Sequence, residues 1–174
     1  GRIISTDNAS GAIDKNGRLY CWGRNDAGQV GDGPTTQRWT PVEVSGGHTD
    51  WLQVSNDAIT TCGIRGSNGQ GALYCWGTDN EQGLGNGAGV TSSTVPALAS
   101  GGFTDWTRVS VSSGPTWGIG LRANGRAYAW GSNSNGRLGV GDTTSRNVPT
   151  ELAGSYSNWI HVGSHGNHGC GIRG

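Results

Sequence analysis

The sequence predicts an all-β protein built from repeated antiparallel sheets of four strands each. One observation is a tetrapeptide that recurs every 54 residues, as Tyr20-Cys21-Trp22-Gly23, Tyr74-Cys75-Trp76-Gly77 and Tyr128-Ala129-Trp130-Gly131. A second is a tryptophan series in another phase, each followed three residues later by valine, at Trp51, Trp106 and Trp159. A third is the content of 34 glycines in 174 residues. Glycine disfavours long helices because each helical glycine costs about 1 kcal/mol relative to alanine.

Each repeat is expected to hold four short strands separated by polar, glycine-rich turns. In the central copy these strands are expected over residues 52–55, 61–64, 73–76 and within 93–97. The third strand places Leu73 and Cys75 on one face and Tyr74 and Trp76 on the other, because side chains alternate along a strand. Since both faces carry bulky groups, we expect both to be buried. Four strands in a repeat of this length are typical of propeller blades.

Composition and charge exclude several protein classes. The 12 basic residues balance the 12 acidic ones, which argues against a nucleic-acid binder and against an acidic tail. Eight tryptophans argue against a disordered chain. No apolar run is long enough to span a membrane, so membrane insertion is not expected. The chain begins at Gly1 and contains no methionine, which suggests a processed product or a piece of a longer chain.

Two of the four cysteines are expected to form a disulfide. Asn68-Gly69 is a strong hairpin signal because both residues tolerate positive φ. A hairpin centred there places Cys62 opposite Cys75, within disulfide reach. Such a bond indicates an oxidising, extracellular or cell-surface location, whereas four reduced thiols would indicate an intracellular protein. Cys21 and Cys170 lack such partners and are candidates for free thiols or for a bond between copies.

The combined motifs resemble the repeat of the regulator of chromosome condensation family. In the central copy they read Trp51-x-x-Val54-Ser55, Cys62-Gly63-Ile64, Gly71-x-Leu73-Tyr74-Cys75-Trp76-Gly77, Gly83-Leu84-Gly85-x-Gly87 and Pro96. The resemblance covers essentially the whole chain, and the paired cysteines look like those of bacterial and extracellular members. It implies a β-propeller, commonly of seven blades. We therefore expect one array over 1–174, with a repeat end at 1–23, full periods at 24–77 and 78–131, and an incomplete repeat at 132–174. About three blades, with partial blades at both ends, would form an incomplete ring or a fragment.

The resemblance implies little about activity. The founding family member catalyses nucleotide exchange on a small GTPase and docks on nucleosomes. The loop and wedge elements of that exchange activity have no visible counterpart here, and the basic residues are scattered. No nucleophile, base and orienting group occur in a recognisable catalytic pattern. We therefore expect no enzyme, no cofactor and no nucleic-acid partner.

A few residues stand out as candidate contact or modification sites. His165 and His168 lie near Cys170, although their spacing matches no common zinc motif. Trp39 and Trp117 belong to neither tryptophan series and are the candidates for a surface contact. Asn8 begins the sequon Asn8-Ala9-Ser10 and is a candidate glycosylation site.

These observations favour a non-enzymatic structural or protein-interaction module. We expect it to be secreted or surface-exposed, to bind a protein partner or copies of itself, and to belong to a larger propeller or a filament. One alternative is a glycan-binding propeller that uses an exposed tryptophan. Another is an intracellular exchange factor for a GTPase.

Overall fold

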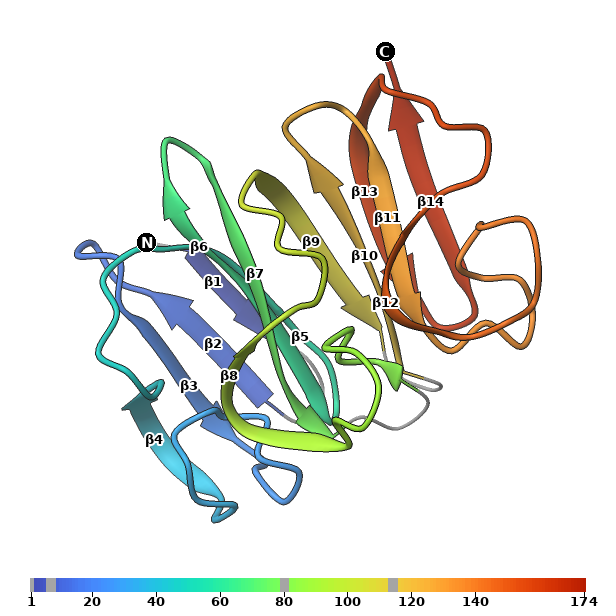
Figure 1. Cartoon of the computed structure of the whole chain (residues 1–174). Helices are drawn as coiled ribbons and strands as arrows, with labels where there is room; N and C mark the ends of the chain where they lie inside the picture. Colours follow the sequence, from blue (N-terminus) through green and yellow to red (C-terminus); the bar gives the residue numbers. More distant parts are fainter. Residues whose placement is uncertain (1, 6–8, 79–81, 113–115) are drawn as a thin grey trace.

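The structure, a computed structural model, describes residues 2–5, 9–78, 82–112 and 116–174. It contains three four-stranded antiparallel blades and a two-stranded partial blade, arranged side by side in chain order (Figure 1). Blade 1 consists of β1 (Arg2–Ser5), β2 (Ala9–Ile13), β3 (Leu19–Gly23) and β4 (Arg38–Glu43). Blade 2 consists of β5 (Trp51–Asn56), β6 (Thr60–Ser67), β7 (Gln70–Thr78) and β8 (Ser92–Leu98). Blade 3 consists of β9 (Trp106–Ser112), β10 (Trp117–Arg122), β11 (Ala127–Gly131) and β12 (Arg146–Glu151), and β13 (Trp159–His165) with β14 (His168–Arg173) forms the partial blade.

The strands expected from the sequence are present, and the all-β blade architecture is confirmed. At the N-terminal end all four strands of blade 1 are in place, so the partial blade lies at the C-terminal end. A sequence period such as 24–77 contains the outer strand of one blade and the three inner strands of the next.

The hairpin of blade 2 has the register that Asn68-Gly69 predicts. Ser67 pairs with Gln70 across the turn, and Cys62 pairs with Cys75 farther along the ladder. Asn68 and Gly69 both adopt positive φ, at 53° and 79°, which matches the right-handed twist of the flanking strands. The hairpin is also tied to the next blade, because Gly71 of β7 pairs with Trp106 of β9.

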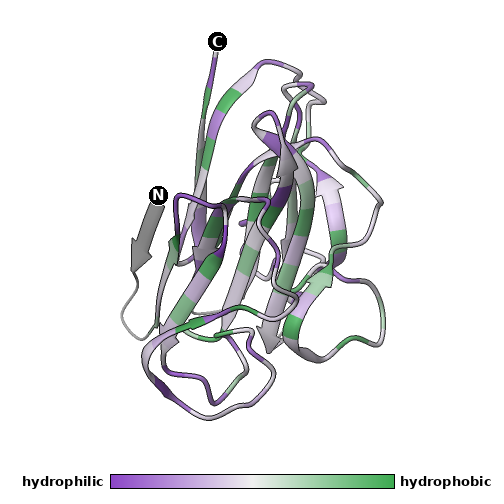
Figure 2. Cartoon of the chain, turned by 90° about the vertical axis from the view of Figure 1, so that its left-hand side faces the viewer, coloured by the Kyte–Doolittle hydropathy of each residue, from purple (hydrophilic) through white to green (hydrophobic). Residues whose placement is uncertain are grey.

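Hydrophobic residues alternate with polar ones along the strands (Figure 2). The buried residues form clusters between neighbouring blades. Each cluster joins residues of the second and third strands of one blade to residues of the first and third strands of the next blade, including their aromatic residues. Blade 1 contributes Ile13, Leu19, Cys21, Val30 and Val44, which pack on Trp51, Val54 and Trp76 of blade 2. Blade 2 contributes Cys62, Ile64, Leu73, Cys75, Leu84 and Ala99, which pack on Trp106, Val109, Val111, Tyr128 and Trp130 of blade 3.

The in-phase tryptophans occupy equivalent places in these interfaces. The Trp76 indole N–H donates to the Gln29 carbonyl at 3.0 Å, and the Trp130 indole N–H donates to the Gly83 carbonyl at 3.0 Å. Both acceptors lie in the loop that follows the third strand of the preceding blade. Each buried indole therefore fixes a loop of the preceding blade as well as filling the interface.

Candidate interaction surfaces

The outer strands of the blades present edges that no other described strand covers. β4, β8 and β12 each pair with a single neighbour in the described sheets. Each contains a proline, at Pro41, Pro96 and Pro149. Proline suits an edge because it lacks the N–H that would donate to another strand. These edges limit uncontrolled strand pairing and leave recognition to their side chains.

Trp39 is the most exposed large hydrophobic residue described. It lies on β4, and 86% of its surface is accessible to solvent. The adjacent Arg38 forms an ion pair with Asp32, which anchors the strand beside it. The expected exposure of Trp39 is thus confirmed, and its role as a surface contact stays a prediction.

Trp117 was expected at the surface, and this expectation is wrong. Its side chain has no solvent exposure, and its indole N–H donates to the Gly166 carbonyl at 2.8 Å. The ring lies close to Gly169 of β14, where an added Cβ would come within 2.9 Å of it. Trp117 therefore fills the interface between blade 3 and the partial blade.

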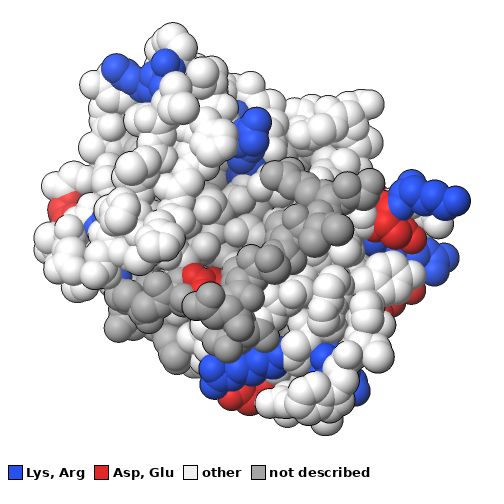
Figure 3. Space-filling view, turned by 180° about the vertical axis from the view of Figure 1, so that it is seen from behind, with Lys and Arg blue, Asp and Glu red and all other residues white. Residues whose placement is uncertain are grey.

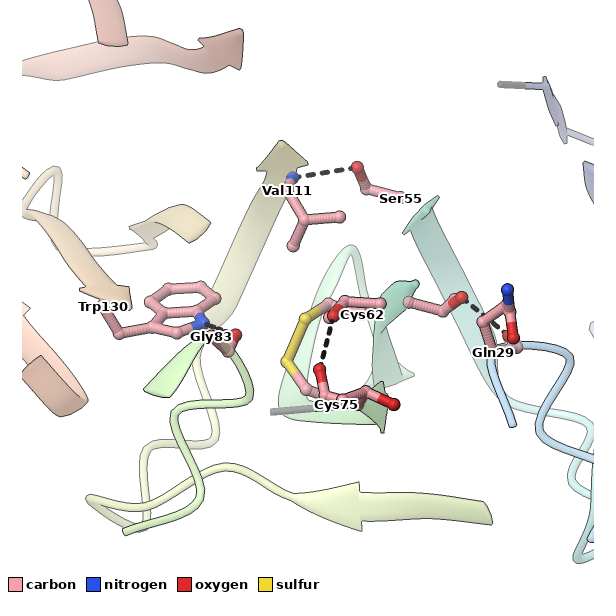
Figure 4. Close-up of a disulfide and its surroundings, with 10 residues drawn as sticks. Gln29, Ser55, Cys62, Cys75, Gly83, Val111 and Trp130 are labelled. Carbon is pink, nitrogen blue, oxygen red and sulfur yellow. Dashed lines mark hydrogen bonds between the residues drawn. A yellow bond between two sulfur atoms is a disulfide. The ribbon is translucent and has the colours of Figure 1, made fainter. Parts of the chain in front are cut away.

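The cysteines fall into three different environments. Cys62 and Cys75 form a disulfide between β6 and β7, inside the core that faces blade 3 (Figure 4). Cys21 is a free thiol in the core between blades 1 and 2, and burial raises its pKa to about 12, with a smaller contribution from the charge of Asp32. Cys170 is free and exposed. A bond between Cys170 of one copy and Cys21 of another would require Cys21 to leave its core.

The partial blade presents an open face with a hollow of about 290 Å³. Cys170 and Ile172 line it, and Ile172 is 59% exposed. In blade 2 the equivalent residues, Cys62 and Ile64, are buried against blade 3. The open face thus carries residue types that pack against a following blade elsewhere in the chain.

The histidines of the partial blade lie on a tight hairpin. His165 pairs with His168 across the turn, with ring centroids 6.0 Å apart. Throughout the part of the chain that the structure describes, no three His, Cys, Asp or Glu side chains converge on a possible metal position. Asn8, the candidate glycosylation site, lies outside the described residues.

Sequence reasoning missed the role of two loop asparagines. The Asn25 side chain donates to the Pro34 and Thr36 carbonyls and accepts from the Val30 N–H. Its repeat equivalent, Asn133, makes the corresponding bonds to the carbonyls of Asp142 and Thr144 and to the N–H of Leu138. Recurrence of asparagine directly after Trp-Gly-x was the available signal. Asn25 thereby holds the loop whose Gln29 carbonyl receives the Trp76 indole N–H, and Asn133 holds the corresponding loop of blade 3.

Charged side chains gather in small groups on the face turned away from Figure 1, several of them with both signs (Figure 3). Among the residues that the structure describes, seven ion pairs join arginines to carboxylates. No helix in the described part of the chain is long and apolar enough to cross a membrane.

Comparison with known proteins identifies the family. The model of the regulator of chromosome condensation (RCC1) repeat matches residues 16–55 and 124–172, and a second RCC1-repeat model matches 109–137. The chain belongs to the RCC1-repeat family. The family resemblance expected from the sequence is therefore confirmed. The match includes the first-strand tryptophans Trp51 and Trp159 and the third-strand Trp130.

Among relatives of this RCC1-repeat chain, human E3 ubiquitin-protein ligase HERC2 is 33% identical over 151 residues, which are 83% of this chain and 3% of HERC2. Prp20p from Saccharomyces cerevisiae has a similar structure, with a TM-score of 0.82 at 20% identity over 99% of this chain and 43% of Prp20p. The ectodomain of the receptor kinase CR4 from Physcomitrella patens has a TM-score of 0.53 at 19% identity, over 98% of this chain and 37% of that ectodomain. The chain thus spans less than half of each of these proteins, and the two structures establish the propeller fold.

Proposed function

We propose that this chain is a non-enzymatic protein-interaction module of an extracellular or surface-exposed propeller. It binds protein chains, including further copies of itself, through the edges of its outer strands. The observation that carries the proposal is Trp39, an indole with 86% of its surface exposed on a strand whose outer edge is uncovered. Tryptophan is enriched among the residues that dominate binding energy at protein interfaces.

Other exposed apolar side chains support the same surface. Val95 and Leu98 of β8 are 40% and 53% exposed, and Val148 of β12 is 37% exposed. All lie on outer strands, as Trp39 does. Because the prolines of these strands limit pairing with another strand, the exposed apolar side chains suit a partner that packs its own side chains against them.

The relatives support a binding role. The structure of Prp20p is described together with its binding to Gsp1p and histones, which are protein partners. The similarity to the ectodomain of CR4 and the Cys62–Cys75 disulfide support a location outside the reducing cytosol. We extend the binding role, but not those particular partners, to this chain.

Sedimentation velocity at rising protein concentration tests the proposal. We expect the average sedimentation coefficient of the 174-residue chain to rise with concentration, and the rise to disappear in Trp39→Ser. Thr40→Ser, an exposed change on the same strand, is the matched control and should behave like the wild type. A monomer at every concentration, or association that Trp39→Ser does not alter, would contradict the proposed surface. A glycan array with hits that depend on Trp39 would instead favour a lectin.

A further inference from the structure

A hollow of about 480 Å³ lies where β5, β9 and β13 begin. We call it the Arg108 hollow; its walls include Leu52, Gly69, Thr107, Arg108, Leu121 and Ile160. These residues come from blade 2, blade 3 and the partial blade. The volume falls in the range of about 300–1,000 Å³ that is usual for ligand pockets. It is large enough for a side chain together with part of its backbone.

Arg108 differs from the other arginines whose side chains the structure describes. Seven of them pair with carboxylates. Arg137 donates to two serine hydroxyls, and Arg173 lies 3.7 Å from the centroid of the Tyr156 ring. The Arg108 side chain, which belongs to a partly buried residue, has no hydrogen bond, ion pair or ring contact among the described residues. None of its guanidinium nitrogens is among the fully buried unpaired atoms of the described residues, so the fork stays open to the hollow and to an incoming ligand.

The repeat explains why this guanidinium is left free. In Trp-x-x-Val, the position before valine is Gln53 in blade 2, Arg108 in blade 3 and His161 in the partial blade. The Gln53 amide donates to the Val109 carbonyl at 3.0 Å and accepts from the Val109 N–H at 3.2 Å, which joins β5 to β9. An arginine has only donors and cannot complete this two-way bond. Arg108 therefore occupies the repeat position at which Gln53 joins two blades, but it does not make such a connection itself.

The long hairpin of blade 2 supplies another part of the wall. Eight residues separate Ile64 from Leu73, whereas five separate the corresponding residues in the hairpins of blades 1 and 3. Because Gly71 pairs with Trp106, the extended hairpin lies beside β9, and Gly69 at its turn reaches the hollow. The longer hairpin and Arg108 are thus two features in which this chain differs from its other repeats, and both line the Arg108 hollow.

We propose that the Arg108 hollow binds a carboxylate side chain of an acidic peptide segment from a protein partner. The planar guanidinium fork matches a carboxylate, which it can bind through two parallel hydrogen bonds. One cation neutralises one carboxylate, whereas a phosphate dianion would leave charge unbalanced. Leu52, Leu121 and Ile160 offer apolar surface to the aliphatic stem and to neighbouring residues of the peptide. The inference rests on the proposed role in protein interaction and specifies the partner's chemistry.

Nuclear magnetic resonance with ¹⁵N-labelled protein tests this site directly. The probe is acetyl-Leu-Glu-Leu-amide, and acetyl-Leu-Gln-Leu-amide is its neutral counterpart. We expect the glutamate peptide to shift the Arg108 Nε–Hε resonance in a saturable manner, with at least tenfold weaker binding of the glutamine peptide. The resonance is identified by its loss in Arg108→Gln.

The variants separate this site from general charge effects. Arg108→Gln should retain the fold, because Gln53 occupies the same repeat position, and should bind the glutamate peptide at least tenfold more weakly. Arg24→Gln removes the same charge from an exposed pair with Asp26 and should leave the affinity unchanged. Equal binding by Arg108→Gln, equal binding of both peptides, or a response to inorganic phosphate alone would overturn the assignment. Because the sedimentation test depends on Trp39, failure of either test leaves the other interpretable.

Discussion

Replacing Trp130 by phenylalanine tests whether the blades are held together by their in-phase indoles. Trp130 is fully buried between blades 2 and 3, and its N–H donates to the Gly83 carbonyl (Figure 4). Phenylalanine leaves this carbonyl without its donor, which costs about 1–3 kcal/mol. The smaller ring also leaves roughly 40 Å³ unfilled, which at about 24 cal/mol per Å³ adds about 1 kcal/mol. We expect the free energy of unfolding to fall by about 2–4 kcal/mol.

Trp22 provides the matched control. It occupies the same repeat position in blade 1 and is only half-buried. Its indole has no hydrogen-bond partner among the residues that the structure describes. Trp22→Phe should therefore cost about 1 kcal/mol or less. Urea denaturation followed by far-UV circular dichroism measures both variants. Equal losses of stability would refute the role assigned to the indole bond, because the substitutions are chemically identical.

Three further outcomes follow from burial and charge. Iodoacetamide at pH 8 should alkylate the exposed Cys170 and spare Cys21 until the protein is denatured. The reason is that a pKa of about 12 leaves about 1 in 10⁴ of the Cys21 thiols ionised at this pH. Mass spectrometry measures the labelling of each cysteine, and equal labelling would contradict the burial of Cys21. Arg146, with help from backbone N–H donation, holds the pKa of Asp142 below its ordinary value. This pair therefore contributes stability above the pKa of Asp142 in the unfolded chain, and the contribution is lost as the pH falls through the pKa of Asp142 in the folded protein. Carboxyl titration by NMR should show a higher Asp142 pKa in Arg146→Ala, and an unchanged value would be inconsistent with the ion pair. Gly118→Ala should lower stability by about 1–3 kcal/mol in urea denaturation, because the new Cβ would lie 2.5 Å from a buried indole; no loss would mean that the ring can shift.

Much of the fold was predictable because its signals are local and repeated. The alternation from Leu73 to Trp76 identified a strand buried on both faces, and the Asn68-Gly69 turn determined the register that places Cys62 opposite Cys75. Such signals depend on neighbouring residues and backbone geometry, which the sequence contains. The place of the tryptophans in the core was also accessible, because residues in equal phase occupy equivalent environments.

The environment of Trp117 depends on residues that lie far away in the chain. Its departure from both tryptophan series suggested a surface position, but the space for its ring is created by Gly169 of β14. Its indole acceptor, Gly166, lies in the hairpin turn between β13 and β14. The glycine content of that hairpin was visible, but which face it presents to Trp117 follows only from the packing of one blade on the next.

A position at which one repeat differs in residue type from the other repeats is informative about function when the different residue lacks the interaction that the equivalent residue makes. Trp117 departs from Thr60, the equivalent residue of blade 2, yet it fills its interface and bonds a carbonyl, so its departure is explained by packing. Arg108 departs from Gln53, and its guanidinium gains no partner in the described structure. A stability requirement alone would favour glutamine, which joins two strands with both halves of its amide. A ligand from outside the chain that carries a negative charge would give this guanidinium, which lines a hollow, the partner it lacks among the described residues, and this is why Arg108 marks a binding position more convincingly than Trp117 does.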